Sequence, residues 1–136
     1  LELSFPAEVS EKVLAIILNL SFSKNIVQKK KLSREGQIVQ DADRLEALGA
    51  IGIARAFAYG GKKGRPLHDP AIKPVKYSSI ESYRNTPGPT INHFYEKLFL
   101  LKSQLNTKTA KSIATKREKF MRKFLDVFYA EWDGKQ

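Results

Sequence analysis

The sequence contains no cysteine and only two histidines, His68 and His93. Without cysteine, a disulfide scaffold, a cysteine-ligated zinc ion, an iron–sulfur cluster and thiol catalysis are all excluded. Two histidines are too few for a three-histidine zinc site, and no helix with the His-Glu-x-x-His pattern is present. Any metal site must therefore be rich in carboxylates or be completed by residues from elsewhere.

Long hydrophobic runs are also missing. The longest run, Val13–Leu18, falls far short of the ~20 residues that a membrane-spanning helix needs. No signal-type or transit-type segment precedes it. We therefore expect a cytoplasmic protein that does not span a membrane.

Acidic residues are scarce relative to basic ones. The 136 residues include 24 Lys and Arg against 14 Asp and Glu, which gives a formal net charge of +10. Hydrophobic residues make up 42% and charged residues 28% of the chain, a composition typical of globular domains. A globular protein this basic is expected to bind an anionic substrate or partner, and phosphate is the obvious candidate for the anionic group.

No stretch alternates between apolar and polar residues as a half-buried strand would, whereas apolar residues recur at spacings of three and four. We therefore expect an all-α helical bundle that forms a single domain over residues 1–136. Residues 60–88 lack this helical periodicity and are predicted to form a long loop. The pattern predicts four main helices, over about 6–22, 33–59, 90–105 and 107–134.

The helix predicted over residues 33–59 carries small side chains at steps of three and four. Because small side chains let another backbone come close, this stripe is expected inside the bundle. Asp43 stands at its head and is then partly buried, where a carboxylate needs a cation or a metal ion as partner. Asp41 is the rival ligand, but its position two residues away turns it off the stripe. The stripe consists of Ala47, Ala50, Ala54 and Ala58.

Two arginines in the same predicted helix are candidates for binding phosphate. Arg44 and Arg55 are eleven residues apart, which puts them on one edge of a continuous helix, roughly 16 Å from each other. They could form ion pairs with neighbours such as Asp41 and Glu46, or bind substrate phosphates near a metal ion. The spacing alone leaves both interpretations open.

Motifs of several other enzyme classes are absent. No serine lies in a Gly-x-Ser-x-Gly context, so acyl transfer by a nucleophilic serine is not indicated. The basic, glycine-rich segment 60–66 could approach phosphate groups, but it lacks the spacing of a P-loop. It is more typical of a solvated turn.

The segments Ile38–Gly61, centred on Gln40-Asp41-Ala42-Asp43-Arg44-Leu45-Glu46-Ala47, and His93–Leu98 closely resemble the HD-domain metal-dependent phosphohydrolases. The resemblance runs from about Val9 to Trp132, and it is greatest to the small bacterial-type branch associated with nucleotide pyrophosphohydrolysis. It implies an HD-type helical bundle, a divalent metal such as Mn2+ or Mg2+, and an anionic small-molecule substrate, for which a nucleotide is the expected class. Assembly into a homo-oligomer is compatible with the sequence.

The superfamily holds its metal through a histidine, a His-Asp pair on another helix, and a later aspartate in an Ala-Asp-Arg-Leu type sequence. Only the last is matched here, so the resemblance assigns Asp43 as a metal ligand and catalytic residue. No histidine precedes His68, and the His68-Asp69 pair follows Asp43 and runs directly into Pro70. The resemblance therefore implies that the chain is the C-terminal portion of such a domain and is inactive by itself. Its upstream ligand helices would be truncated, not represented or lost in evolution.

In a complete site of this family, the metal would lower the pKa of a bound water and so provide the hydroxide that attacks phosphorus. Cations would stabilise the charge on the phosphate oxygens, and we expect Arg44, Arg55 and Lys97 in this substrate-binding role. His93 is the candidate hydrogen-bond donor or proton carrier near the leaving group. The alternative for His93 is a satisfied core histidine.

Two other functions compete with this hypothesis. A basic helical module could bind nucleic acid or a protein partner without catalysis, although the aromatic residues fall on the apolar stripe and not among the lysines. The missing ligands also fit a catalytically inactive, regulatory or interaction fragment. The basic residues concerned are Lys29–Lys31 and, on the last predicted helix, Lys108, Lys111, Lys116, Lys119, Arg122 and Lys123.

Overall fold

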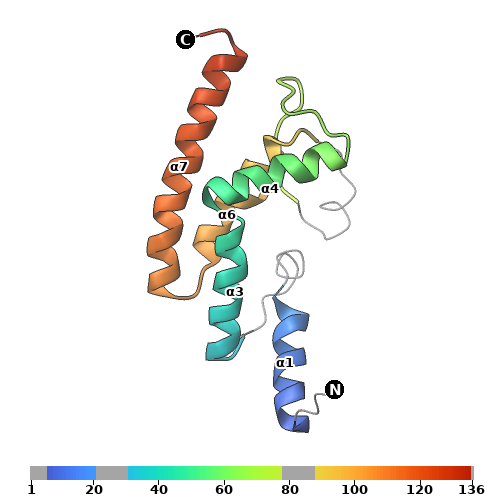
Figure 1. The fold of residues 1–136 in the computed structure, drawn as a ribbon, viewed down its shortest axis with the longest axis vertical. Helices are drawn as coiled ribbons and strands as arrows, with labels where there is room; N and C mark the ends of the chain where they lie inside the picture. Colours follow the sequence, from blue (N-terminus) through green and yellow to red (C-terminus); the bar gives the residue numbers. More distant parts are fainter. Residues whose placement is uncertain (1–5, 21–30, 78–87, 136) are drawn as a thin grey trace.

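The computed structural model describes residues 6–20, 31–77 and 88–135, and within these ranges all regular structure is helical. The predicted all-α class is confirmed. In Figure 1, α7 runs along one side, α4 and α6 lie against it, and α1 stands beside α3 at the opposite end from the C-terminus. None of the described helices combines the length and the apolar character needed to cross a membrane. The helices are α1 (Ala7–Asn19), α3 (Arg34–Glu46), α4 (Gly49–Lys62), η1 (Phe94–Leu98), α6 (Phe99–Leu101), η2 (Lys102–Gln104) and α7 (Lys108–Trp132).

The hydrophobic core lies where the continuous η1 and α6 segment packs between α4 and α7. Three phenylalanines meet there: the ring centroids of Phe57 and Phe94 are 6.1 Å apart, and Phe124 lies 5.9 and 6.2 Å from them. Phe94 of this segment thus contacts α4 through Phe57 and α7 through Phe124. The buried hydrophobic residues are Leu48, Ile53, Ile91, Phe94, Leu98, Leu101, Leu105, Ala110, Ala114, Met121 and Leu125.

A sharp corner separates α3 from α4, so the single helix predicted over residues 33–59 is wrong. Leu48 has extended backbone angles (φ −115°, ψ 155°) and is buried in the core, and Gly49 follows with φ +80°. A Cβ atom at Gly52 would lie 2.2 Å from the carbonyl oxygen of Ala47. Glycine at both positions therefore allows the chain to turn while Leu48 enters the core.

Capping residues begin two of the helices where the sequence predicted. Ser33 accepts a hydrogen bond from the Gly36 amide at 3.2 Å, and Thr107 accepts one from the Ala110 amide at 3.2 Å. Pro6 is the N-cap of α1 and not its first helical residue. These bonds satisfy amides that have no partner inside the helix.

Two predicted boundaries differ from the structure. Gly60 and Gly61 do not stop α4, which continues to Lys62, and α1 ends at Asn19. Within the predicted loop 60–88, residues 63–77 form no helix, whereas residues 78–87 lie outside the described part of the chain. Lys29 and Lys30, which were named for a basic binding module, also lie outside it.

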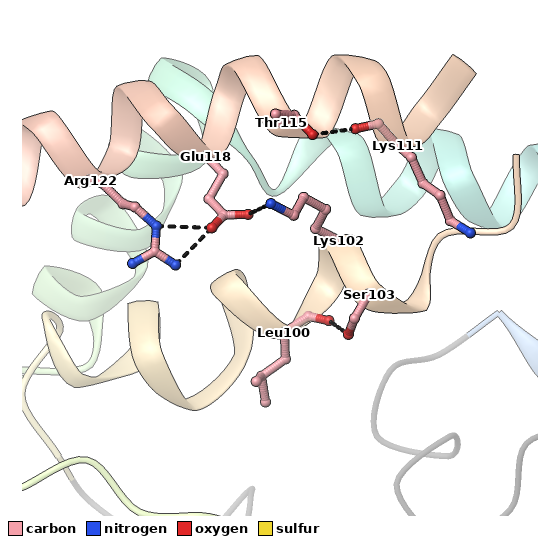
Figure 2. Close-up of polar contacts among 7 residues, drawn as sticks. All are labelled: Leu100, Lys102, Ser103, Lys111, Thr115, Glu118 and Arg122. Carbon is pink, nitrogen blue, oxygen red and sulfur yellow. Dashed lines mark hydrogen bonds and ion pairs between the residues drawn. The ribbon is translucent and has the colours of Figure 1, made fainter. Parts of the chain in front are cut away.

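A buried glutamate fastens α7 to the short helices beside it, as Figure 2 shows. Glu118 is buried, and its Oε2 lies 2.8 Å from Lys102 Nζ while its Oε1 accepts from Arg122 at 2.7 and 2.9 Å. Burial raises the pKa of Glu118, but the bonds and charges of these two cations outweigh it, so the pKa lies below its usual value. The guanidinium of Arg122 also covers the ring of Phe99 at 4.2 Å.

Candidate active-site cleft

A cleft of about 660 Å³ opens between α4, the segment that follows it, and η1. Its size suits a small molecule and not a macromolecular strand lying flat on the surface. The lining combines positive charge with aromatic rings. The charged and aromatic residues of its wall include Arg55, Tyr59, Arg65, Tyr77, His93 and Lys97.

A π-helical turn presents two of the sequence-predicted residues to the cleft. His93 caps this turn, which runs from Phe94 to Leu98, and Lys97 lies inside it. In this wide turn, residues four apart fall on nearly the same side, so both side chains line the cleft. Phe94 and Leu98 are buried in the core cluster and anchor the turn there, and Leu98 also contributes to the cleft lining.

Burial keeps the imidazole of His93 neutral at pH 7. Burial first, and then the positive charges of Lys97 and Arg65, together lower the pKa of His93 to about 4. A neutral imidazole donates one N–H and cannot act as a cationic acid. His93 therefore lines the cleft as a neutral imidazole, and its role as a hydrogen-bond donor to a substrate stays a prediction.

The environment of Lys97 links Asp43 to the same cleft. Burial lowers the pKa of Lys97, the negative charge of Asp43 raises it, and the positive charge of Arg55 lowers it again. Ala47, one helical turn after Asp43, is itself part of the cleft wall. Asp43 does not line the cleft itself, but it lies within electrostatic range of Lys97, which does.

Arg65 is a cleft residue that sequence reasoning missed. Gly64 has φ +64° and ends α4 in a Schellman motif, in which the Arg65 amide donates to the Gly60 carbonyl at 2.9 Å. This return brings the Arg65 guanidinium to 5.8 Å from the centre of the Tyr59 ring. The glycine four residues after Gly60 was the available signal, because glycine after a helix is typical of such a cap.

Arg55 lies in the cleft with His93 and Lys97, but Arg44 does not, so the prediction that both arginines border one cleft is wrong for Arg44. The corner at Leu48 puts them on different helices. Arg44 is 2% exposed and donates from Nη1 to the carbonyl of Gln104. It therefore holds α3 against the turn before α7 instead of facing a substrate.

The two aspartates of α3 have the reverse of the predicted burial: Asp41 is buried and Asp43 is exposed. Asp41, 3% exposed, accepts hydrogen bonds from the amides of Asn106 and Thr107, each at 2.8 Å. Asp43 is exposed. The expectation that Asp43 faces the interior beside a buried alanine stripe is wrong, because the stripe is interrupted by the corner. Its members Ala50, Ala54 and Ala58 are exposed.

The ion pair that the sequence left open for Arg55 is present. Arg55 Nη1 lies 3.2 Å from Glu46 Oε2, and their side chains are 61% and 73% exposed. A pair this exposed stabilises the fold little, ~0–1 kcal/mol, so it does not prevent Arg55 from binding an anion. Both interpretations of Arg55 therefore remain compatible with its position.

The described residues do not make up a metal centre by themselves. No three His, Asp or Glu side chains among them gather as metal ligands do. His68, in the His-Asp dipeptide, lies in the non-helical segment and packs edge-on against Tyr129 and Trp132, each 5.2 Å away between ring centres. Among the described residues, Asp43 therefore belongs to no cluster of three or more possible metal ligands.

No family model matches the chain. Among solved structures, a protein from Lactobacillus plantarum is 52% identical with a TM-score of 0.90, over 95% of this chain and 63% of that one. An HD-superfamily hydrolase from Bacillus thuringiensis is 47% identical with a TM-score of 0.69, over 97% of this chain and 57% of that one. The chain has the HD-superfamily fold.

A relative in Bacillus subtilis, the uncharacterised protein YpgQ, is 40% identical over 119 residues, which are 87% of this chain and 50% of YpgQ. The crystal structure of YpgQ in complex with ADP is 33% identical with a TM-score of 0.70, over 94% of this chain and 55% of that one. The chain therefore spans about half of the curated relative that it matches. The resemblance to HD-type hydrolases agrees with these neighbours at the level of the fold.

Proposed function

We propose that this protein is a metal-dependent phosphohydrolase of the HD type that acts on a nucleotide. The observation that carries the proposal is the convergence of Arg55, Arg65 and Lys97 around a neutral His93 in one cleft. Several cations from different segments are what a phosphoryl group needs as its charge shifts during transfer. The complex of the relative YpgQ with ADP supports a nucleotide as the ligand.

In this proposal the chain's own side chains bind and orient the phosphates. Arg55 offers two parallel N–H donors to phosphate oxygens, and Lys97 supplies a compact charge beside it. His93 donates its single N–H to a phosphate oxygen or to the leaving group, since a pKa of about 4 leaves it neutral near pH 7. His93 is therefore proposed as a neutral hydrogen-bond donor and not as a proton carrier.

Asp43 is proposed as one ligand of the divalent metal, either Mn2+ or Mg2+, which would supply an activated water. One carboxylate holds these hard cations only weakly, because they require several fixed oxygen or imidazole ligands. The remaining ligands must come from residues other than the described ones. Cytoplasmic location and homo-oligomer formation also stay predictions.

Hydrolysis of nucleoside triphosphates with Mn2+ or Mg2+ tests this function. We expect negligible turnover by the 136-residue chain, and turnover by a version extended with an upstream His and His-Asp segment. In that version Asp43→Ala should lower kcat about 100-fold or more, whereas the exposed control Asp133→Ala should not. Turnover by the 136-residue chain that survives Asp43→Ala would rule out the HD-type mechanism.

A non-catalytic, nucleic-acid-binding role is the competing function, and one observation favours it. The lysines along the outer face of α7 are exposed, among them Lys111, Lys116 and Lys119. Binding of a short oligonucleotide that falls steeply with salt and ignores Mn2+ would support this alternative. Binding of a nucleotide that depends on Arg55 and Lys97 would support hydrolysis instead.

A further inference from the structure

The segment that follows α4 is fastened to the η1 side of the cleft by two polar side chains four residues apart. Asn92, which is buried, donates from Nδ2 to the Ile72 carbonyl at 2.9 Å. Glu96 accepts from the Val75 amide at 3.2 Å and from the Tyr77 hydroxyl at 2.9 Å. Residues 71–76 are exposed, so apolar burial contributes little to holding this part of the segment.

The contact between Glu96 and Tyr77 fixes an aromatic ring in the wall of the cleft. Both residues line the cleft, and the Tyr77 hydroxyl donates a hydrogen bond to the Glu96 carboxylate. The hydrogen bond at its hydroxyl restricts rotation of the Tyr77 side chain and leaves a face of the ring available for a ligand to pack on. A ring held in this way loses less conformational entropy when a ligand packs on it.

The lining of the cleft combines cations with one carboxylate that is hydrogen-bonded to Tyr77. Arg55 and Lys97 attract an anion, whereas Glu96 disfavours an anion close to the Tyr77 ring. A phosphate chain is therefore favoured beside the two cations, and an uncharged group is favoured beside the ring. An aromatic ring stacks on any nucleobase, because every base has a π-face.

We propose that Glu96 is a positioning residue that holds Tyr77 as the binding surface for the nucleoside part of the nucleotide. The phosphates of the same molecule lie at Arg55 and Lys97. This inference rests on the proposed function and adds that different residues of the cleft bind different parts of the nucleotide. Tyr77 recognises the uncharged part, and Glu96 acts only through Tyr77 and the backbone at Val75.

Isothermal titration of the protein with ADP and with pyrophosphate, in metal-free buffer, distinguishes binding of the nucleoside part from binding of the phosphates. Tyr77→Ala should weaken ADP binding about tenfold, the usual effect of removing a stacking ring, and leave pyrophosphate binding within twofold. Glu96→Ala and Glu96→Gln both remove the negative charge, but only Gln keeps an oxygen that can accept a hydrogen bond. Glu96→Ala should therefore bind ADP about threefold more weakly than Glu96→Gln, while the two bind pyrophosphate equally.

Tyr77→Phe provides a second test that removes only the hydroxyl, and it should reproduce the selective loss of ADP affinity seen in Glu96→Ala. The exposed Glu131→Gln on α7 is the matched control and should change neither ligand. Equal behaviour of Glu96→Ala and Glu96→Gln toward ADP, or equal losses of ADP and pyrophosphate in Tyr77→Ala, overturns the inference. If Arg55→Ala still weakens the binding of both ADP and pyrophosphate in that case, the proposed function stands. If the unmodified protein binds neither ligand, both proposals fall.

Discussion

Replacing Asp41 by alanine is expected to destabilise the protein, whereas replacing Asp43, two residues away, is expected to leave its stability nearly unchanged. The Asp41 carboxylate accepts from the amides of Asn106 and Thr107 at 2.8 Å and from the Asn106 side chain at 2.9 Å. It lies at the start of α7, where the first amides have no partner within the helix. Burial lowers the pKa of Arg44, and of the two carboxylates that raise it again, Asp41 has the larger effect.

The magnitude follows from what the alanine variant leaves behind. A buried donor without a partner costs about 1–3 kcal/mol, and Asp41→Ala strands two backbone amides. Water entering the space recovers part of this, so we expect a loss of about 3 kcal/mol in the free energy of unfolding. For a domain of this size that corresponds to a fall of about 10 °C in Tm. Asp43→Ala should stay within about 0.5 kcal/mol, as is usual for an exposed site.

Urea denaturation at neutral pH, with thermal unfolding as a second measurement, compares the two variants at a common m-value.

A pH series adds a further check. Burial raises the pKa of Asp41, but hydrogen bonds from Asn106 and Thr107 lower it more, so the net pKa is lowered. Its stabilisation is thus present above the ordinary carboxylate pKa and is lost as the pH falls through the lowered one. The difference between wild type and Asp41→Ala should shrink in acid. A loss below 1 kcal/mol, or equal losses in the two variants, would refute this reasoning.

Two further predictions concern packing around the cleft and α7. Gly60→Ala should lower the free energy of unfolding by about 1–3 kcal/mol, because its Cβ would lie 2.1 Å from the buried Thr90 hydroxyl. The neighbouring Gly61→Ala meets open space and should raise the free energy of unfolding by up to about 1 kcal/mol through its higher helix propensity. Urea unfolding that ranks the two variants the other way would contradict this account of the packing. Glu118→Gln should lose about 1–2 kcal/mol at pH 7 and progressively less as the pH falls through its lowered pKa, because the native carboxylate then becomes protonated as well. Denaturation at several pH values checks this, with the exposed Glu131→Gln as control.

Local features of the sequence were sufficient to predict the all-α class and two of the helix N-caps. Apolar spacing and the residues Ser33 and Thr107 depend only on neighbours within a few positions, and the structure agrees with them. The same holds for His93 and Lys97, whose separation by four residues puts them on one side of a turn. The absence of cysteine and the excess of basic residues likewise limited the chemistry before any fold was known.

The tertiary structure alone decided which of the similar side chains face the cleft. Asp41 and Asp43 differ by two positions on one helix, and Asp41 turns inward because its hydrogen-bond donors at Asn106 and Thr107 come from the chain more than sixty residues later. The corner at Leu48 likewise forms because that side chain enters a core built by α7 and η1, which local helix preference does not register. Periodicity describes one helix at a time, whereas the direction of a side chain depends on partners that only folding brings together.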